Sequence, residues 1–301
     1  MKPAEFEYHA PRTVPEVLAL LAQYGPEAKV LAGGQSLVQL MNIRAIQPAH
    51  VVDINGVDDL AIADEKDDRL RLGSLVRQAT VEHSPAVADA CPLLAEAVPH
   101  IGSPQVRNRG TVGGSLAYAS PSAELPAAAL ALDAEIVLSS QRRQRIVAAS
   151  DFFAAPFTTI MEPDELLTEV RLPPLTGKTG WSFWEVSRRK NDLPVAAAVA
   201  VLRLSDDSTI SYVRLALAGV GPTPTRCFQA ERNLIGASVP DDGFTAVAEH
   251  AAAALDPPSD MHAPSAYRRA LAKVLAARSL REATEHAQQH ERSAPGTSRR
   301  R

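Results

Sequence analysis

The chain has 301 residues, 46% of them hydrophobic, which is enough for one large domain or two ordinary ones and speaks against disorder or a fibrous repeat. Its formal net charge of −4 gives no general reason to expect nucleic acid or an anionic membrane as a partner. The first residues, MKPAEFEYHAPRT, hold no apolar signal region, and no apolar run approaches the roughly 20 residues that span a bilayer. We therefore expect no transmembrane segment and a cytoplasmic location.

The first elements form a small β-α-β-like opening. Thr13 and Glu16 have capping-box spacing and Pro15 suits a first turn, so a helix should begin here and end near Gly25. A short strand is expected at 29–31 and another at 51–54. The first of these runs directly into a glycine pair.

Further elements complete a first domain. Residues 60–75 suggest a hairpin with strands at Leu60–Ala63 and Arg69–Gly73, and apolar residues from Val87 to Val98 recur at the spacing of one helix of about three turns. Two strands are expected at 135–138 and 145–148. The segment Leu172–Gly177, with two adjacent prolines, ends a strand and is typical of a linker.

The second part begins with strands and ends with helices. Strands are expected at 181–187, 196–204 and 209–218, and helices at about 225–234, 243–255 and 265–285. In the last helix the predicted buried face is Tyr267, Ala270, Leu271, Val274 and Leu275. We accordingly divide the chain into a first domain at 1–176, a second at 177–286 and a mobile tail at 287–301.

The sequence Ala32-Gly33-Gly34-Gln35-Ser36 directly follows a predicted strand. Paired glycines let main-chain N–H groups converge on an anion without obstruction by a Cβ atom. A helix beginning near Ser36 would add its positive end to that site. Taken alone, the turn could equally be a tight strand-to-helix connection that binds nothing.

A second pair occurs in Gly110-Thr111-Val112-Gly113-Gly114-Ser115, now flanked by hydroxyl groups. Two such turns facing one another could hold a diphosphate without a lysine, and Thr111 and Ser115 could add side-chain donors. The chain has neither a GxGxxG pattern nor a GxxxxGK[ST] pattern, so a Rossmann site and a P-loop are not indicated. Gly219 to Pro224 is better explained as a structural turn, because its prolines remove donors.

Signals for metal or nucleophilic chemistry are weak. Cys91 and Cys227 lie far apart, outside any CxxC or Cys/His cluster, so an iron–sulfur cluster or zinc site on this chain is not expected. His286 and His290 have the one metal-like spacing among the eight histidines, but no third ligand is evident nearby. Ser120 lies in no nucleophile elbow. We predict no metal site and no catalytic residue.

Two charged features leave alternatives open. Glu124 precedes an apolar helix, where it could be a helix-start residue or could accept hydrogen bonds from a ribose or a ring. Arg188, Arg189, Lys190 and Asp192 follow a predicted strand, and a solvated turn is the simplest interpretation.

The segments AGGQSLVQLMNIR and IGSPQVRNRGTVGGSLAYASPSAELPAAALALDA resemble the two signature segments of the FAD-binding medium subunit of molybdenum hydroxylases. DELLTEVRLP, AGVGPTPTR and YRRALAKVLAARSL extend the similarity over about 285 residues. The resemblance implies an α+β fold with an FAD-binding domain of the vanillyl-alcohol oxidase type, in which two α/β subdomains clasp FAD. A smaller C-terminal domain of sheet and helices would follow.

The resemblance also implies site residues. The pyrophosphate would be held by the two turns, that is by Ala32, Gly33, Gly34, Gln35, Ser36 and Leu37 together with Thr111, Gly113, Gly114 and Ser115. Ile101 and Gly102 would lie beside the flavin or adenine portion, and Glu124 takes the place of an acidic residue near the adenosine or ribitol. Asp192 matches an acidic residue that approaches the isoalloxazine, Leu166 matches a leucine near the rings, and Lys190 shares the loop of Asp192.

The chain departs from the family at two places. Trp184 and Glu185 stand where many relatives have a lysine, which puts a hydrogen bond to the flavin from that side in doubt. Leu193 stands where some relatives place an aromatic residue over the flavin, so access to that ring face can differ.

By this resemblance the chain passes electrons and does not attack the substrate. A large molybdopterin subunit would hydroxylate the substrate, a small subunit with two [2Fe–2S] clusters would carry electrons, and FAD here would deliver them to an external acceptor, in a dimer of heterotrimers. The alternatives are a self-sufficient FAD-dependent oxidase or reductase of the vanillyl-alcohol oxidase type and a non-enzymatic module with purely structural turns. The second domain lacks the histidine or tyrosine cluster that a self-sufficient enzyme would use as its substrate base.

Overall fold

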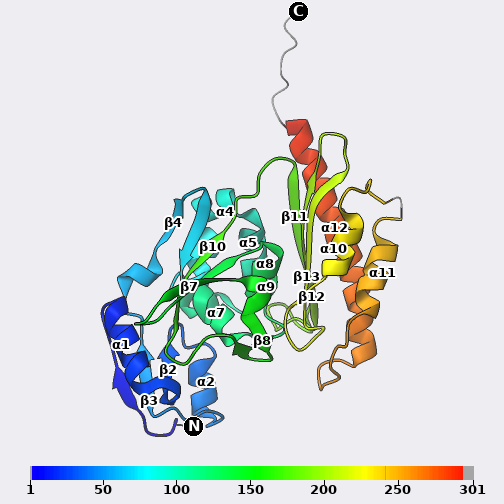
Figure 1. The fold of residues 1–301 in the computed structure, drawn as a ribbon. Helices are drawn as coiled ribbons and strands as arrows, with labels where there is room; N and C mark the ends of the chain where they lie inside the picture. The colour runs from blue at the N-terminus through cyan, green and yellow to red at the C-terminus, as the bar shows by residue number, and fades with distance from the viewer. Residues whose placement is uncertain (1, 241, 294–301) are drawn as a thin grey trace, which may run out of the picture.

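The first lobe of the molecule holds a small parallel sheet. The computed structural model describes residues 2–240 and 242–293, and Figure 1 shows their course. Three parallel strands pair in the order β1-β3-β2. The elements of this lobe are β1 (Glu7–His9), α1 (Val14–Tyr24), the 3-10 turn η1 (Gly25–Glu27), β2 (Ala28–Leu31), α2 (Leu37–Asn42) and β3 (His50–Asp53).

Helix α1 begins where the sequence predicts. Thr13 accepts from the main-chain N–H of Glu16, and the Glu16 carboxylate accepts from the N–H of Thr13, so the capping box is confirmed. The helix buries Val17, Leu18 and Leu21 in a core that also contains strand β3. This packing fixes the sheet whose strand ends carry the first glycine pair.

The second lobe is a five-stranded antiparallel sheet in the order β4-β5-β10-β6-β7. Its strands are β4 (Ala63–Lys66), β5 (Arg69–Gly73), β6 (Glu135–Ser139), β7 (Gln144–Ala148) and β10 (Leu166–Leu172), and a small ribbon is formed by β8 (Phe153–Ala155) and β9 (Thr158–Thr159). The helical segments are η2 (Asp58–Ala61), α3 (Gln78–His83), α4 (Pro85–Ala90), α5 (Pro92–Ala97), η3 (Val98–His100), α6 (Pro104–Arg109), α7 (Val112–Tyr118), α8 (Glu124–Ala131) and α9 (Ala149–Phe152).

Two predictions for this lobe are corrected. The first hairpin strand is β4, which begins at Ala63, whereas Leu60 lies in the 3-10 turn η2 and is buried. The single helix expected from Val87 to Val98 is divided into α4, α5 and η3. Pro92 has no N–H to continue the ladder, so it starts a new helix after Cys91.

The C-terminal domain is a four-stranded antiparallel sheet in the order β11-β12-β13-β14, covered on one face by helices. The three long strands confirm the predicted ones. The elements are β11 (Thr179–Val186), β12 (Ala196–Leu204), β13 (Ile210–Ala218), β14 (Thr225–Arg226), α10 (Phe228–Leu234), α11 (Thr245–Ala253) and α12 (Ser265–Ser293). The segment 173–178 joins β10 to β11, and the expected class, mixed helix and sheet with a smaller second domain, is confirmed.

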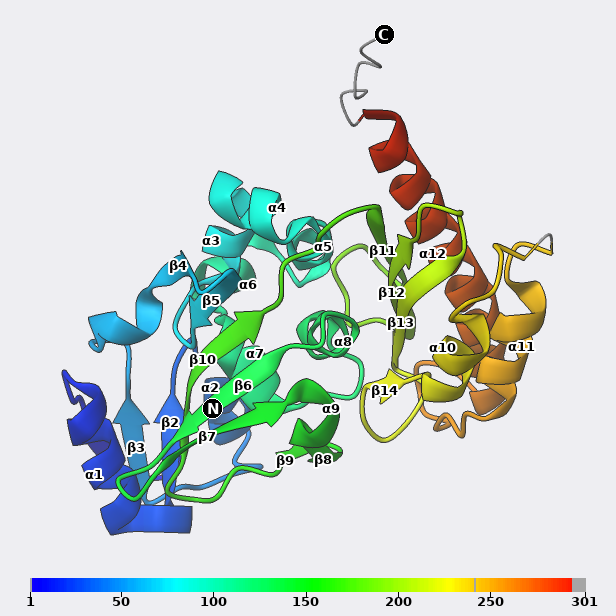
Figure 2. The same ribbon diagram turned by 45° about the horizontal axis from the view of Figure 1, so that its top comes forward.

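Helix α8 lies between the second lobe and the C-terminal sheet (Figure 2). All eight of its residues are buried, as expected of a helix that is apolar on every side. Beyond its end, Asp133 accepts hydrogen bonds from Tyr212 at 2.9 Å, Arg214 at 2.6 Å and Arg226 at 2.8 Å. One carboxylate of the first domain thus receives three donors from the second.

The buried face of α12 differs from the predicted one. Tyr267, Ala270 and Val274 are exposed, whereas Leu275 is buried and Leu271 is partly buried, as predicted. The other buried positions are mostly small residues such as Ala272, Ala276 and Ala283. The reason is close approach, because a Cβ atom on Gly180 of β11 would lie only 1.9 Å from the carbonyl oxygen of Ala283. Large side chains therefore cannot fit where α12 crosses Gly180, although Leu275 and Leu280 are buried earlier in the helix.

Helix α12 also extends to Ser293, so the first part of the segment expected to be a mobile tail, 287–293, is helical. Residues 294–301 of that prediction lie outside the described residues. Within the described ranges, no helix combines the length and apolar character needed to cross a bilayer.

Candidate functional site

The two glycine pairs lie face to face. A Cβ atom on Gly33 would come within 2.2 Å of the carbonyl oxygen of Arg109. A Cβ atom on Gly114 would lie 3.8 Å from the Cβ atom of Ala32. Only glycine permits the first of these contacts. The juxtaposition expected from the sequence is therefore present, and it is made by residues 80 positions apart in the chain.

The first turn offers a run of free donors. No hydrogen bond from the main-chain N–H groups of residues 33–37 is found in the described part of the chain, although the carbonyls of Gly34 and Ser36 accept from α2. Gly34 has φ +76°, a left-handed conformation that reverses the chain so that successive N–H groups can point outward. Such a series of amides forms a concave anion-binding site.

The second turn works differently from the sequence-based expectation. Its N–H groups are already used inside the protein: that of Val112 donates to Val76, that of Gly113 to Ser74 and that of Ser115 to Thr111. Thr111 is only 2% exposed, and its hydroxyl accepts from the N–H of Gly114 at 3.0 Å. The expectation that both turns present main-chain donors is thus wrong for the second, which forms a rigid wall opposite the first.

A clamp that sequence reasoning missed holds the two turns together. Arg77 donates from Nη1 to the carbonyl of Arg109 at 2.7 Å and from Nη2 to the side-chain oxygen of Asn55 at 2.6 Å. Asn55 in turn donates to the carbonyl of Ala32 at 2.7 Å. The only sequence signal was the Asn-Gly pair after a strand, which is an ordinary turn pattern.

The charges beside the clamp favour an anion. Burial and then the nearby positive charge of Arg109 lower the pKa of Arg77, while Asp53 acts in the opposite direction. Burial alone would raise the pKa of Asp53, but hydrogen bonds from Tyr8 and Asn55 outweigh it, so its pKa is lowered and it stays ionised. The guanidinium groups of Arg77 and Arg109 and the carboxylate of Asp53 therefore lie near the first turn.

A second part of the site surrounds Ile101 and Gly102, which lie just before α6. Arg107 donates to the carbonyls of both, at 3.0 and 2.7 Å, and its guanidinium is fixed by a bidentate pair with Glu82. Asn191 of the C-terminal domain donates to the carbonyl of Pro99 at 3.0 Å. Helix α6, with six residues or about 9 Å in length, connects this part to the second glycine turn.

The turn at 187–194 therefore packs against the segment that holds Ile101 and Gly102. Asp192, next to Asn191, is half-buried, whereas Lys190 and Leu193 are exposed. The predicted residues of this turn are thus brought near Ile101 and Gly102 by Asn191, which the sequence analysis did not single out.

Buried acidic groups lie where the two domains meet. The Glu185 side chain is only 6% exposed and forms a 3.3 Å contact with Nδ1 of His100. Hydrogen bonding to Glu185 is the main reason that the pKa of His100 is raised. Glu124 is 3% exposed, and burial, with a smaller contribution from the charge of Glu185, raises its pKa to about 7. Glu124 is thus poised to exchange a proton near neutral pH.

The two positions that depart from the family pattern face different ways. Trp184 donates to Glu282 and lies under the guanidinium of Arg278, so it faces α12. Glu185 faces the first domain, and its Oε2 atom is buried without a hydrogen-bond partner among the described residues. Leu166, predicted to pack near the rings, is buried in the core of the first lobe, in the same cluster as Leu75.

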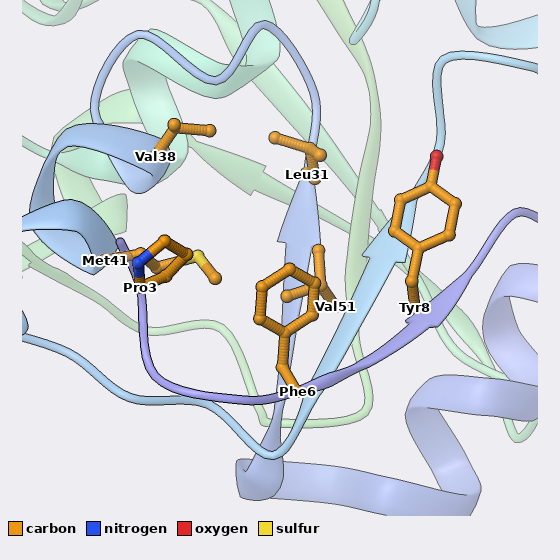
Figure 3. Close-up of a pocket in the computed structure, with 7 residues that line it drawn as sticks. All are labelled: Pro3, Phe6, Tyr8, Leu31, Val38, Met41 and Val51. Carbon is orange, nitrogen blue, oxygen red and sulfur yellow. The ribbon is translucent and has the colours of Figure 1, made fainter. Parts of the chain in front are cut away.

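An apolar hollow adjoins the first glycine turn. Leu31 and Val38 flank the turn, and Figure 3 shows both pointing into the hollow with Phe6 and Met41. Its volume of about 110 Å³ is well below the roughly 300–1,000 Å³ of a typical small-molecule site. It could therefore take only part of a large ligand.

One member of the histidine pair singled out in the sequence has a main-chain partner. Nδ1 of His286 lies 2.8 Å from the carbonyl oxygen of Trp181, which occupies that ring nitrogen. The side chain of His290 lies outside the described part of the structure.

Both cysteines are buried and unpaired, and burial raises the pKa of each thiol to about 12, as expected of inert core residues.

Comparisons with known proteins bear on both parts of the chain. Residues 4–175 match the family model described as "FAD binding domain in molybdopterin dehydrogenase". Residues 181–283 match the model described as "CO dehydrogenase flavoprotein C-terminal domain".

Relatives are similar over almost their whole length. The chain is 37% identical to the carbon monoxide dehydrogenase medium chain of Hydrogenophaga pseudoflava, over 93% of this chain and 97% of that protein. It is also 37% identical to caffeine dehydrogenase subunit beta of Pseudomonas sp. (strain CBB1), over 95% and 97% of the two chains. A solved structure of the Hydrogenophaga pseudoflava carbon monoxide dehydrogenase, lacking the Mo-pyranopterin moiety, superimposes with a TM-score of 0.92 over 95% of this chain and 99% of that chain.

Proposed function

This chain belongs to the family of FAD-binding flavoprotein subunits of molybdenum hydroxylases, and on that premise we propose that it transfers electrons within a heterotrimeric enzyme of this class. Electrons would arrive from [2Fe–2S] clusters of a small partner subunit and leave to an external acceptor. Substrate hydroxylation would take place on a large molybdopterin subunit. The observation that carries the proposal is the run of free amides at residues 33–37, walled by the second glycine pair.

The donor set suits a dinucleotide diphosphate. Five successive main-chain N–H groups need acceptors, and the charges of Arg77 and Arg109 favour an anion. We propose that the first turn, from Ala32 to Leu37, binds the phosphates through these amides. In the second turn, Thr111 and Gly113 would shape the wall, while Gly114 and Ser115 are half-buried and would contact the phosphates.

The other half of the cofactor would lie toward the C-terminal domain. We propose that Ile101, Gly102, Glu124, Lys190 and Asp192 surround its ribityl or ring portion, supported by the contact of the 187–194 turn with residues 99–102. We also propose that Leu166 packs near the rings from the core of the first lobe, where its side chain is buried in the same cluster as Leu75.

FAD, when bound, supplies the redox chemistry, because its ring system exchanges electrons singly or in pairs. The chain itself holds and orients the cofactor, and the buried Glu124 and the Glu185–His100 pair set the electrostatic environment on the domain-facing side. No side chain of this protein needs to attack a substrate.

We infer the partner subunits from the metal cofactors for which this chain shows no cysteine cluster. Its two cysteines are single and buried, so [2Fe–2S] clusters and molybdopterin would be held by the small and large subunits. We also propose a dimer of heterotrimers and a cytoplasmic complex without nucleic acid. Substrate specificity would reside in the large subunit.

We propose domain limits of 1–176 and 177–286, supported by the family matches at 4–175 and 181–283 and by the joining segment after β10. The first domain would be of the vanillyl-alcohol oxidase type. Its two sheets, which lie on either side of the paired glycine turns, would be the two subdomains that clasp FAD.

The decisive experiment is reconstitution of the purified full-length chain with FAD. We expect one FAD per chain, seen as a visible flavin spectrum that survives gel filtration, and no turnover of substrate without partners. A protein that stays colourless after incubation with FAD contradicts the proposal. Turnover of a substrate by the chain alone would instead favour a self-sufficient flavin oxidase or reductase.

A further inference from the structure

Three potential metal ligands meet on the face of the first sheet that α1 covers. Glu7 and His9 are two residues apart on β1, so their side chains point to the same face of the strand. Strand β1 pairs in parallel with β3, and the register places Glu7 directly beside His50. Tyr8, between them, points to the opposite face, into the apolar hollow of Figure 3.

The ligand atoms are already close to the spacing that a metal requires. Nε2 of His9 lies 3.2 Å from Nδ1 of His50, and Oε2 of Glu7 lies 3.3 Å from that Nδ1 and 4.0 Å from the Nε2. Zinc binds imidazole nitrogen at about 2.0–2.1 Å in tetrahedral geometry, so two bound nitrogens are roughly 3.3 Å apart. Only the Glu7 carboxylate must move, and its side chain is 71% exposed and free to do so.

The two imidazole rings are held in place. Tyr24, at the end of α1, stacks on His50 with ring centroids 3.7 Å apart and an angle of 16° between the planes, and it also contacts His9 at 5.1 Å. The His9 and His50 side chains are 20% and 14% exposed. Because the rings lose little freedom on binding, a metal would meet a largely prepared pair of ligands.

We propose that Glu7, His9 and His50 form a binding site for a divalent first-row transition metal ion, with Zn²⁺ as the expected occupant and water as its fourth ligand. Two imidazoles and one carboxylate are a common zinc ligand set with one position open. The ion would join the edge strand β1 to β3. The sequence analysis predicted no metal site because His50 lies 41 positions after His9, so the three ligands show no metal-binding spacing.

This site is independent of the proposed flavin site. His50 and Glu7 lie at the N-terminal ends of β3 and β1, whereas the first glycine turn follows the C-terminal end of β2 in the same parallel sheet. Metal binding can therefore be measured with or without FAD. The expected consequence is local, namely a more firmly attached N-terminal strand.

The test uses the untagged full chain, freed of metal with a chelator and titrated with Co²⁺ and Zn²⁺. We expect one Co²⁺ per chain with the intense visible absorption of a four-coordinate ion, its displacement by Zn²⁺, and a rise in Tm with Zn²⁺. Mutation of outer partners of metal ligands costs about 10- to 100-fold in affinity. Loss of a ligand, in His9→Gln or His50→Gln, should therefore weaken binding at least about 100-fold.

His250→Gln, at an exposed position on α11, is the matched control and should bind as the unmodified chain does. Thermal melting of each variant without metal shows whether it is folded. Glu7→Gln is a third ligand variant, and its side chain is exposed. Binding that survives both His9→Gln and His50→Gln, or that is lost only in His286→Gln, overturns the proposal. The absence of any stoichiometric Co²⁺ binding by the unmodified chain overturns it as well.

Discussion

Gly33 packs so tightly against Arg109 that no Cβ atom fits between its α-carbon and the Arg109 carbonyl, which would lie 2.2 Å away. The same carbonyl accepts a hydrogen bond from Arg77, which also reaches Asn55 and through it Ala32. The turn after β2 and the turn between α6 and α7 are thereby fixed opposite each other. The proposed cofactor site depends on this close contact between the two glycine turns.

Substitution in the glycine turns should abolish FAD retention. Gly34→Val forces a β-branched residue into a left-handed conformation and crowds Leu31 and Val38, at 3.3 and 3.1 Å, so the free amides would be misdirected. Gly114→Val should act similarly, because its Cβ would displace the capping hydroxyl of Thr111 at 2.6 Å. The measurement is the flavin content of each purified variant.

Gly236→Val is the matched control for backbone strain. Gly236 also has a positive φ, +82°, but no atom lies within 4 Å of its Cβ position, and it is in the C-terminal domain. This variant should lose stability and keep its FAD. Full flavin occupancy in both Gly34→Val and Gly114→Val would show that the site has been assigned wrongly.

Arg77→Ala should loosen the contact between the glycine turns while leaving the sequence of both turns unchanged. Hydrogen bonds made by a charged donor contribute about 1.5–3 kcal/mol each, so we expect a loss of stability of about 2 kcal/mol and weaker FAD binding. Urea denaturation and FAD titration measure the two effects. In Arg142→Ala, which removes an exposed guanidinium with acidic partners, both quantities should be nearly unchanged. Equal behaviour of the two variants would argue against the clamp.

Burial of Glu124 should make the stability of the FAD-free protein fall as pH rises. Its pKa is raised from 4.5 to about 7, so between these values the folded state binds a proton that the unfolded state has released. The stabilising contribution is present below about pH 4.5 and is lost as pH rises through about 7, and it amounts to about 3 kcal/mol at most.

Glu124→Gln tests this prediction, because the amide cannot ionise. Denaturation midpoints from pH 5 to pH 8 should fall less steeply for the variant than for the unmodified chain. The charges of Glu185 and His100 act on position 124 in both proteins, so only the difference between the two pH profiles is informative. Parallel profiles would mean that the carboxyl group is not held protonated.

Asp133→Asn should weaken the attachment of the two domains. Burial alone would raise the pKa of Asp133, but hydrogen bonds from Arg226 and Arg214 lower it, so the carboxylate is charged at neutral pH. Asparagine tolerates the positive φ of +49° at position 133, so the backbone should be unaffected. The variant removes the negative charge that faces Arg226, whose side chain is 5% exposed. We expect a loss of about 2 kcal/mol and faster proteolysis at 173–178.

Because Asp206 is fully exposed, Asp206→Asn provides the control, and its stability should be unaffected. The contribution of Asp133 requires its ionised form, so the difference between the unmodified chain and Asp133→Asn should shrink as pH falls through the lowered pKa of Asp133. A constant difference down to acid pH would assign the effect to the backbone instead of the charge.

Local sequence patterns predicted many of the helices and strands. The capping box at Thr13 fixed the start of α1, and the alternating or continuously apolar runs located β11, β12 and β13 within two residues. Where a local pattern conflicted with a stronger local rule, the prediction failed: apolar spacing favoured one helix from Val87 to Val98, but Pro92 interrupts the hydrogen-bond ladder.

The face of α12 could not be found in the same way. Hydrophobicity favoured Tyr267 and Val274, yet both are exposed, and the helix faces the sheet at Gly180 with the small residues Ala283 and Ala287. Which side of a helix is buried depends on the separation of its partner, and that separation is set by a glycine about 100 residues away. The same holds for the ligands of the proposed metal site, which are neighbours only through strand pairing.

By itself the sequence determined the two glycine turns, the family they indicate and the order of the domains, because these depend on residue types at short spacing. Tertiary structure alone decided which turn keeps free amides and which is consumed by its own hydrogen bonds, since a main-chain donor is available only if no acceptor from elsewhere in the chain reaches it. It also decided that Arg77, Asn55 and Asn191 hold the site together, because their partners come from distant segments that only folding brings within hydrogen-bond distance.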